Sequence, residues 1–127
     1  MTKAYLDTTH LVAITAVLDR WQQGIADGDL HAIASAFTPD ALFQGMTPTF
    51  TIGQDAVKEY YGRQAPGLTV AYQILNLRQL ADDAVVAYLS ATFTKGKGDL
   101  RQTHITTVLR GLPDGWRIAH YHVSTVH

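Results

Sequence analysis

Three polar side chains alternate along the segment IAHYHVS, residues 118–124, near the end of the sequence: His120, His122 and Ser124. Alternate residues of a β-strand point to the same face of a sheet, so these side chains should form one row. Imidazoles in such a row can act as an acid and a base near neutral pH, bind a metal ion, or pack as flat rings in an interface.

A third histidine, His104, falls on the strand predicted just before this segment. A hairpin that turns within GLPDG would set His104 opposite His122, with the other histidine one diagonal away. Two imidazoles at alternate positions plus one from the neighbouring strand fit a tetrahedral zinc site. The alternatives are an acid/base role and packing with Trp116 and Ile118 in an interface. We predict no bound metal, because spacing alone does not show that the rings converge.

Composition excludes several classes of protein. The 127 residues suffice for one domain with its own hydrophobic core, and we treat residues 1–127 as that domain. The chain has 10 basic and 11 acidic residues, a net charge of −1, and so no basic surface for nucleic acid. The absence of cysteine excludes disulfides, thiolate metal sites and thiol nucleophiles. The apolar run LVAITAVL is too short to span a bilayer, so we expect a cytoplasmic protein with no membrane partner.

Helical periodicity dominates the first part of the chain. Apolar residues spaced three or four apart predict a helix from about residue 8 to the DGD segment: Leu11, Ile14, Leu18, Trp21 and Ile25. Asp29 is the expected N-cap of a second helix that continues through Phe37 until TPD stops it. Short strands over residues 41–45 and 50–53 and a third helix over 54–64 follow.

The remainder of the chain is predicted to be β-structure. We expect four strands, at residues 69–79, 84–95, 99–110 and 116–126, separated by the turn segments ADD, KGKG and GLPDG. Helices followed by a run of antiparallel strands indicate an α+β fold, in which the helices cover one face of a curved antiparallel sheet.

This order of elements and several short motifs resemble a known superfamily. The motifs are FTPDA at residues 37–41, GQDAVKEYY at 53–61 and GWRIAHYHVS at 115–124. They are similar to those of the nuclear-transport-factor-like superfamily of cone-shaped α+β proteins, and within it to the SnoaL-like and SgcJ/EcaC-like group. A similar last motif ends the association domain of calcium/calmodulin-dependent kinase II. The resemblance covers nearly the whole chain and implies a cone-shaped barrel of helices and sheet with an internal pocket, assembled as a homodimer.

The superfamily includes ketosteroid isomerases, polyketide cyclases, dehydratases and pure binding modules. In the isomerases the base would fall on Gly45, the oxyanion-hole phenol on Trp21, and a protonated acid near Thr106 or Thr107. Because none of these residues can take those roles, we predict no steroid delta-isomerase activity. The resemblance implies a small, apolar, polyketide-like or steroid-like ligand and no cofactor. The chain would be a cyclase, isomerase or dehydratase using histidine and tyrosine for proton transfer, or a non-catalytic binding or accessory module.

The alternation of apolar residues predicts which face of each strand meets the helices. On strands 84–95 and 99–110 the odd-numbered residues form the inward set. For the last strand, the resemblance implies that the odd-numbered residues, Tyr121 among them, also point inward, which leaves the histidines on the outer face. If this parity were reversed, His120 and His122 would enter the pocket as its acid and base.

The candidate site residues follow from this assignment. The candidate catalytic residues can donate or accept a proton: His104, His120, His122 and Tyr121. The candidate ligand-binding residues are inward-facing aromatic, hydroxyl or apolar side chains: Trp21, Phe43, Tyr60, Tyr72, Thr107 and Val123. The outer face, with Trp116, Ile118 and the histidines, would expose more apolar surface than a monomer of this size usually tolerates. It is therefore the predicted two-fold dimer interface.

Overall fold

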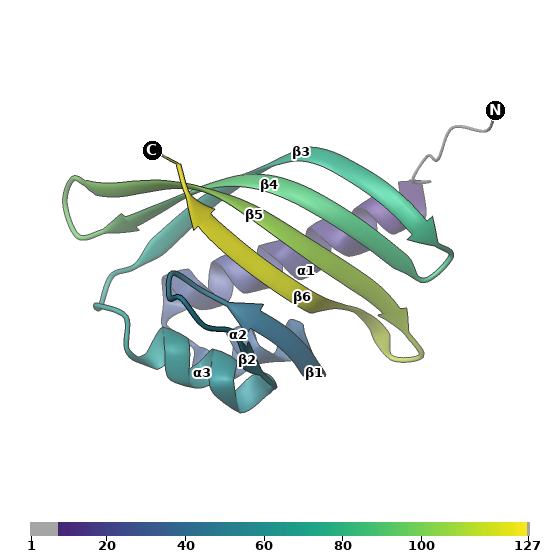
Figure 1. Ribbon diagram of the computed structural model, residues 1–127, viewed down its shortest axis with the longest axis horizontal. Coiled ribbons are helices and arrows are strands. Elements are labelled where there is room, and N and C mark those ends of the chain that lie inside the picture. The colour runs from purple at the N-terminus through teal and green to yellow at the C-terminus, as the bar shows by residue number, and fades with distance from the viewer. Residues whose placement is uncertain (1–7, 127) are drawn as a thin grey trace.

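A curved six-stranded sheet with helices on its concave face makes up the fold (Figure 1). The computed structural model describes residues 8–126. In chain order the elements are α1 (Thr8–Asp27), α2 (Leu30–Ser35), β1 (Phe37–Gln44), β2 (Thr51–Ile52), α3 (Gln54–Gly62), β3 (Thr69–Ala81), β4 (Ala84–Lys95), β5 (Asp99–Leu112) and β6 (Gly115–Thr125). The predicted α+β class, with N-terminal helices against a curved sheet, is confirmed, and the sheet stays open at both edge strands.

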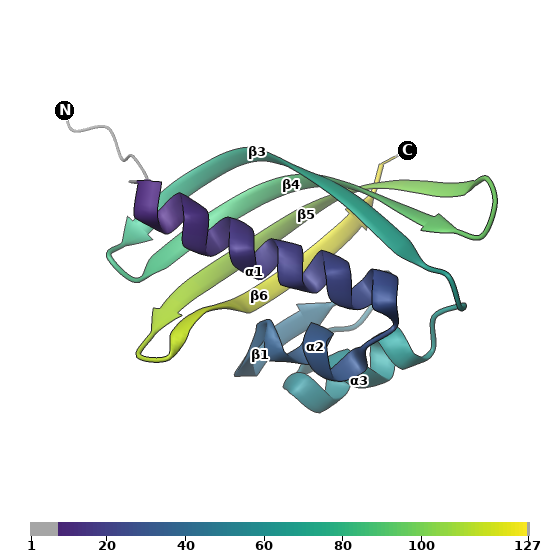
Figure 2. The ribbon, with the colours of Figure 1, turned by 180° about the vertical axis from the view of Figure 1, so that it is seen from behind.

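Helix α1 crosses the concave face of the sheet, as the view from behind shows (Figure 2). Its buried residues follow the predicted spacing: Ile14, Val17, Leu18, Trp21 and Ile25. The chain leaves α1 at Gly28, whose φ of 65° is a conformation that glycine adopts without strain. Asp29 caps α2 as predicted, because its Oδ1 accepts a hydrogen bond from the Ala32 N–H at 3.0 Å. Within residues 8–126, every helix is too short or too polar to cross a bilayer.

The strands lie in the order β2-β1-β6-β5-β4-β3. Strands β3 to β6 pair antiparallel with their sequence neighbours, whereas β1 runs parallel to β6. The parallel pair places the end of β1 beside the end of β6, so that Met46, just after β1, contacts Thr125. The loop after β1 therefore reaches the same end of the sheet as the β4–β5 turn.

Strand β1 begins at Phe37, earlier than predicted. Helix α2 ends at Ser35. The buried Phe37 therefore belongs to a strand and not, as the sequence had predicted, to the end of the helix. A proline inside a strand is uncommon, because proline has no N–H to donate to a neighbouring strand. Pro39 is accommodated where the register between β1 and β6 shifts, between Phe37 and Leu42.

A β-bulge in the last hairpin changes the predicted faces of β6. Val108 lies opposite His120, whereas the next residue, Leu109, lies opposite Ile118. The extra residue, Ala119, reverses the alternation of faces at this point. Ile118 is therefore only 1 % exposed, on the concave side, and its predicted place on the outer face is wrong.

Trp116 is moved to the concave side by the same bulge. It pairs with Gly111, and its ring meets the ring of His10 on α1, with centroids 5.2 Å apart. A side chain at Gly111 would come within 3.0 Å of the Trp116 ring, so the indole occupies the space that the glycine leaves open. The predicted outer position of Trp116 is wrong too, and the outer face is more polar than the sequence indicated.

The hydrophobic core lies between α1 and the concave face of the sheet. The alternation predicted for β4 and β5 is confirmed, since their odd-numbered inward residues are buried: Val85, Ala87, Leu89, Ala91, Phe93, Thr103, Ile105, Thr107 and Leu109. Beyond the bulge, Tyr121 and Val123 of β6 join the same core, as predicted. The concave face therefore determines which side chains can surround a ligand.

Candidate functional site

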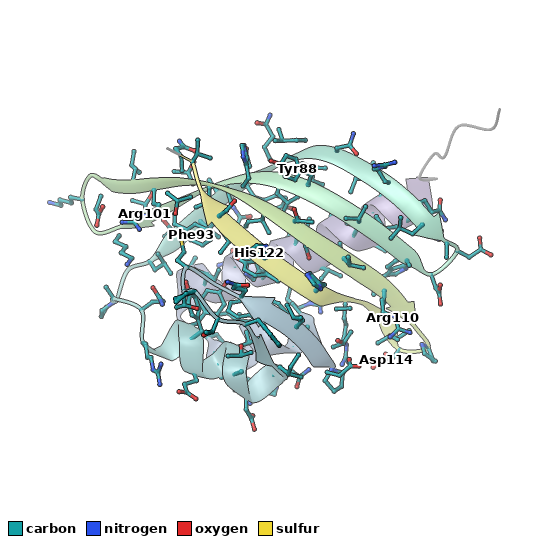
Figure 3. The ribbon with its side chains drawn as sticks, in the orientation of Figure 1. Tyr88, Phe93, Arg101, Arg110, Asp114 and His122 are labelled. Atoms are coloured by element: carbon teal, nitrogen blue, oxygen red, sulfur yellow. The ribbon has the colours of Figure 1, made fainter. Side chains whose placement is uncertain are left out.

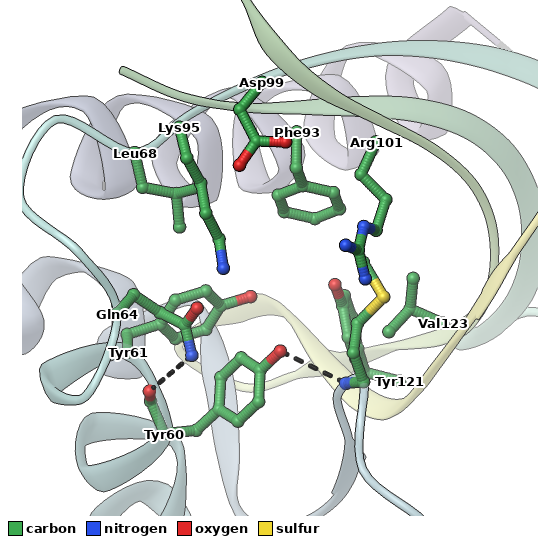
Figure 4. Close-up of a pocket in the computed structure, with 11 residues that line it drawn as sticks. Tyr60, Tyr61, Gln64, Leu68, Phe93, Lys95, Asp99, Arg101, Tyr121 and Val123 are labelled. Atoms are coloured by element: carbon green, nitrogen blue, oxygen red, sulfur yellow. Dashed lines mark hydrogen bonds between the residues drawn. The ribbon is translucent and has the colours of Figure 1, made fainter.

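The β4–β5 hairpin projects past the C-terminal end of α1 (Figure 2). The residues around a pocket place it at this end of the sheet. Its cavity volume is about 70 Å³, and the hollow measures about 550 Å³ when the open, solvent-filled mouth is included. We call it the phenol pocket, and its lining, drawn in Figure 4, is Met46, Tyr60, Tyr61, Gln64, Leu68, Phe93, Lys95, Asp99, Arg101, Tyr121 and Val123. These side chains come from the loop after β1, from α3 and the segment after it, and from β4, β5 and β6.

The floor of the phenol pocket is apolar and aromatic. Phe93, Leu68 and Val123 are buried there. Tyr121 is 3 % exposed, and its ring stacks on that of Phe43, with centroids 4.7 Å apart and 12° between the ring planes. Packed aromatic rings lose little freedom when a ligand binds, so this floor offers a preformed flat surface to a ring-bearing molecule.

Three phenol groups share the pocket, from Tyr60, Tyr61 and Tyr121 (Figure 4). The Tyr60 hydroxyl accepts a hydrogen bond from the backbone N–H of Met46 at 3.1 Å. The Tyr61 hydroxyl accepts one from Trp21 Nε1–H at 3.0 Å. Because both hydroxyls act as acceptors in these bonds, their own protons remain available for donation.

The two buried phenols stay protonated at neutral pH. Burial raises the pKa of Tyr61 well above its usual value, and the hydrogen bond from Trp21 opposes only part of that rise. Burial likewise raises the pKa of Tyr121, and the adjacent Tyr61 phenol raises it further. The Tyr61 and Tyr121 hydroxyls also bond to each other, so one of their two protons is engaged between them and the other can be donated to a ligand oxygen, and both groups are poor bases.

Charged side chains stand at the mouth of the pocket. Lys95, Asp99 and Arg101 are exposed and belong to the last residues of β4 and the first residues of β5. Within residues 8–126 none of the three forms an ion pair; the pairs present join Glu59 to Arg63 and Asp114 to Arg117. The mouth thus presents two cations and one carboxylate to an incoming molecule.

The predicted ligand-binding residues fall into three groups. Tyr60, Val123 and the candidate catalytic residue Tyr121 line the phenol pocket. Trp21 and Phe43 lie behind the lining, where Trp21 bonds to Tyr61 and Phe43 stacks on Tyr121.

Tyr72 and Thr107 lie apart from the pocket lining. The Tyr72 hydroxyl donates to Asp19 Oδ1 at 2.6 Å, which ties β3 to α1. Thr107 is fully buried and donates to the His120 carbonyl oxygen at 2.8 Å, so it holds the β5–β6 bulge together.

The three histidines lie on the convex face, turned away from α1 and from the phenol pocket. His104 is opposite Ser124 and not opposite His122, so the predicted register was two residues off. The His104 ring packs beside Tyr88, with centroids 5.2 Å apart, and Figure 3 shows His122 and Tyr88 on this face. No group of three or more potential metal ligands comes together anywhere in residues 8–126.

Sequence reasoning missed the mouth of the pocket. Lys95 has the same parity as the inward residue Phe93, and Arg101 lies directly opposite Phe93 across the β4–β5 ladder. Extending the inward alternation by one residue at each strand end would have found both cations. The alternation of faces was thus a usable signal, but charged residues beside a turn such as KGKG are also typical of a hairpin end that faces water.

A second, more open hollow has a cavity volume of about 420 Å³, or about 860 Å³ with its open mouth included, and lies between the C-terminal end of α1, the start of α2 and the segment after α3. It shares Tyr61, Gln64 and Leu68 with the phenol pocket. The rest of its lining is apolar or glycine, apart from Asp27. Although larger, it lacks a set of converging hydrogen-bonding groups, so the phenol pocket is the better candidate site.

Sequence comparison identifies the family of the chain. The model of the SnoaL-like domain matches residues 14–127, almost the whole sequence. The chain belongs to the SnoaL-like family. No curated protein matches it.

Solved structures share the fold of this SnoaL-like chain at low sequence identity. A ketosteroid isomerase-like protein from Erwinia carotovora atroseptica is 21% identical with a TM-score of 0.78, over 95% of this chain and 99% of its own. An NTF2-like protein of unknown function from Pseudomonas putida is 19% identical with a TM-score of 0.81, over 94% and 89%. The hexachlorocyclohexane dehydrochlorinase LinA-type3 from Novosphingobium barchaimii is 12% identical with a TM-score of 0.82, over 94% and 88%. These likenesses establish the fold alone.

Gly45 stands where the resemblance places the base of the isomerases. In this SnoaL-like chain the Tyr60 ring occupies the space beside Gly45. A Cβ atom at Gly45 would lie 2.3 Å from the Tyr60 ring. The ring is held there by the hydrogen bond from Met46 N–H and by edge-to-face packing on Phe43, with centroids 5.1 Å apart. The phenol therefore fills the space that a carboxylate at position 45 would need.

Proposed function

We propose that this SnoaL-like chain binds a small organic molecule with an apolar, ring-bearing body, polyketide-like or steroid-like in shape, in the phenol pocket. The observation that carries the proposal is the combination of a buried aromatic floor with protonated phenols in one hollow. The floor would remove a ligand ring from water, and the phenols would fix its orientation by donating hydrogen bonds to an oxygen. Small-molecule pockets usually have this composition.

Catalysis is the second candidate function, and the protonated phenols favour it. A phenol that donates to a carbonyl oxygen stabilises the enolate that isomerisation, cyclisation or dehydration forms next to that carbonyl. Tyr121 is the donor we assign to this role, and the Asp99 carboxylate at the mouth would accept the proton that leaves the carbon next to the carbonyl. The relative named as a dehydrochlorinase acts, by its name, on a small chlorinated ring, in keeping with an apolar substrate. The histidines take no part in this scheme, because they lie on the convex face.

Binding can be tested with two neighbouring substitutions of opposite orientation. Val123→Phe fills the pocket, whereas Ser124→Phe adds the same ring to the convex face. A neutral aromatic probe, naphthamide, is titrated into each full-length protein by calorimetry. We expect Val123→Phe to weaken binding at least about tenfold, a loss of about 1.4 kcal/mol, and Ser124→Phe to leave it unchanged. No binding to the wild type, or equal loss in both variants, would contradict the proposal.

Turnover is tested separately. The protein is incubated in heavy water with a cyclic diketone, and exchange of the carbon-bound hydrogens is followed by NMR. Exchange that Tyr121→Phe removes, while naphthamide still binds, would support the catalytic candidate. Binding without exchange would leave the chain as a binding module.

A further inference from the structure

We infer that the ligand of the phenol pocket is an anion, a small ring-bearing molecule with a carboxylate or another acidic group that Lys95 and Arg101 hold at the mouth. This inference rests on the proposed function, because it names the ligand class for the same pocket. Neither cation was among the residues that sequence reasoning selected.

The position of the two cations follows from the β4–β5 ladder. Arg101 lies directly opposite Phe93, and Lys95 follows Phe93 by two residues, so all three side chains share the concave face. Figure 4 shows the Lys95 ammonium and the Arg101 guanidinium turned toward the Tyr61 and Tyr121 hydroxyls from opposite sides of the pocket. Lys97, in the turn between the strands, does not line the pocket.

Lys95 and Arg101 carry no salt-bridge partner among residues 8–126. Asp99 is the single carboxylate among the lining residues, so the mouth carries two positive charges against one negative charge. An acidic ligand would supply the missing counter-charge, whereas an ammonium ligand would be repelled by two groups and attracted by one.

Polarity changes in order from the floor to the mouth. The ring floor of Phe93, Leu68 and Val123 is buried, the phenols of Tyr61 and Tyr121 stand above it, and the cations are exposed. A molecule with a ring at one end and an acid group at the other would match this order in one orientation. Protonated phenols would add donors to the same acid group, and hydrogen bonds to a charged acceptor are stronger than neutral ones.

The test uses three naphthyl probes that share one ring and differ in charge: naphthoate, naphthamide and naphthylmethylammonium. Each is titrated by calorimetry into the full chain at low salt, where the mouth charges are least screened. We expect the wild type to bind naphthoate most tightly and the ammonium probe most weakly. Lys95→Gln and Arg101→Gln should each raise the Kd of naphthoate roughly 3- to 10-fold, because these groups are exposed, and leave naphthamide unchanged.

Two further variants check the charge assignment. Lys97→Gln removes a lysine of the same hairpin that stands outside the lining, and it should leave all three affinities unchanged. Asp99→Asn removes the repelling carboxylate and should tighten naphthoate binding.

The outcomes separate this inference from the proposed function. If naphthamide binds as tightly as naphthoate, or if Lys95→Gln and Lys97→Gln have equal effects, the anion preference is overturned while the pocket proposal stands. The anion preference is also overturned if the wild type prefers the ammonium probe, because the charge of Asp99 would then outweigh those of Lys95 and Arg101. If none of the probes binds, both the pocket proposal and the anion preference are rejected.

Discussion

The two faces of the sheet carry different kinds of polar side chain. On the convex face, His122, Ser124 and Thr106 stand exposed to water. Over the middle of the concave face, polar groups are buried and hydrogen-bonded: Thr107 donates to the His120 carbonyl oxygen, and Thr103 donates to the Ala91 carbonyl oxygen. The same strands supply both sets, one residue apart. Whether a polar group is buried thus depends on the face it occupies and not on its residue type.

Tyr121 and His122 show this difference in two adjacent residues. The histidine is the more reactive side chain in water, yet it remains on an open surface. The tyrosine, ordinarily a weak acid, has its pKa raised by burial among other rings. Burial on the concave face therefore raises the pKa of Tyr121. On the convex face, His122 stays exposed to water.

The largest contrast between the faces should be in stability. Ile105 is fully buried, and its neighbour Thr106 is exposed on the opposite face. Ile105→Ala should lower the free energy of unfolding by about 2 to 5 kcal/mol because it leaves a cavity, and Thr106→Ala by less than about 0.5 kcal/mol. Urea unfolding of both variants measures the difference. Similar losses in the two variants would mean that the faces are not as distinct as the burial indicates.

A second contrast removes a single hydroxyl from each face. Tyr61→Phe takes away the acceptor of the buried Trp21 N–H, so we expect a loss of about 1 to 3 kcal/mol in unfolding free energy. Tyr88 is 40 % exposed on the convex face, and Tyr88→Phe should change stability by less than about 0.5 kcal/mol. Thermal melts of the two variants provide the measurement. An unaffected Tyr61→Phe melt would show that the indole N–H finds another acceptor.

Alkaline pH should destabilise the protein through the concave face. The folded-state pKa of Tyr61 and of Tyr121 is raised above the ordinary value of 10.0, so above that pH the folded state holds more protons than the unfolded state. The stability these groups contribute is complete below pH 10 and is lost as pH rises toward the folded pKa values. Urea midpoints between pH 8 and 11 should fall for the wild type and fall less for Tyr61→Phe. Equal slopes would contradict the raised pKa of Tyr61.

The smallest effect on the stability of the folded chain is expected when a charged residue replaces one on the convex face. The homodimer stays a prediction. The apolar surface available for it on the convex face is smaller than expected, because Trp116 and Ile118 face inward. Tyr88 is the large exposed aromatic residue that remains there, so Tyr88→Arg should convert a convex-face dimer to a monomer without lowering the melting temperature of the monomer. Sedimentation velocity of both proteins decides. A wild-type monomer, or a dimer that tolerates Tyr88→Arg, would remove this face as the interface.

Most elements could be predicted from the sequence because their signals are local. The spacing of Ile14, Leu18 and Trp21 indicated α1, and Asp29 indicated the cap of α2. Strand β4 was predicted with its observed bounds, 84–95, because its alternation is regular and turn residues flank it. Strand β1 was predicted too short, since its Pro39 is tolerated only by the register shift against β6, a contact with the far end of the chain.

The site was predictable in part for the same reason. Tyr121 and Val123 were placed on the concave face by alternation and by the resemblance, and both line the pocket. The cations Lys95 and Arg101 were missed because a charged residue beside a turn looks the same whether it faces water or a pocket. What distinguishes them is the position of α3 and of the loop after β1, which close the other side of the hollow.

The sequence by itself determined the periodicities, the turns and hence the α+β class, because these depend on residues a few positions apart. Only the tertiary structure decided which polar groups share a space. The bulge at Ala119 turned Trp116 and Ile118 inward, and the two-residue register offset separated His104 from His122. A change of one or two residues costs little locally but moves every later side chain to another face or partner, so alternation alone does not fix it.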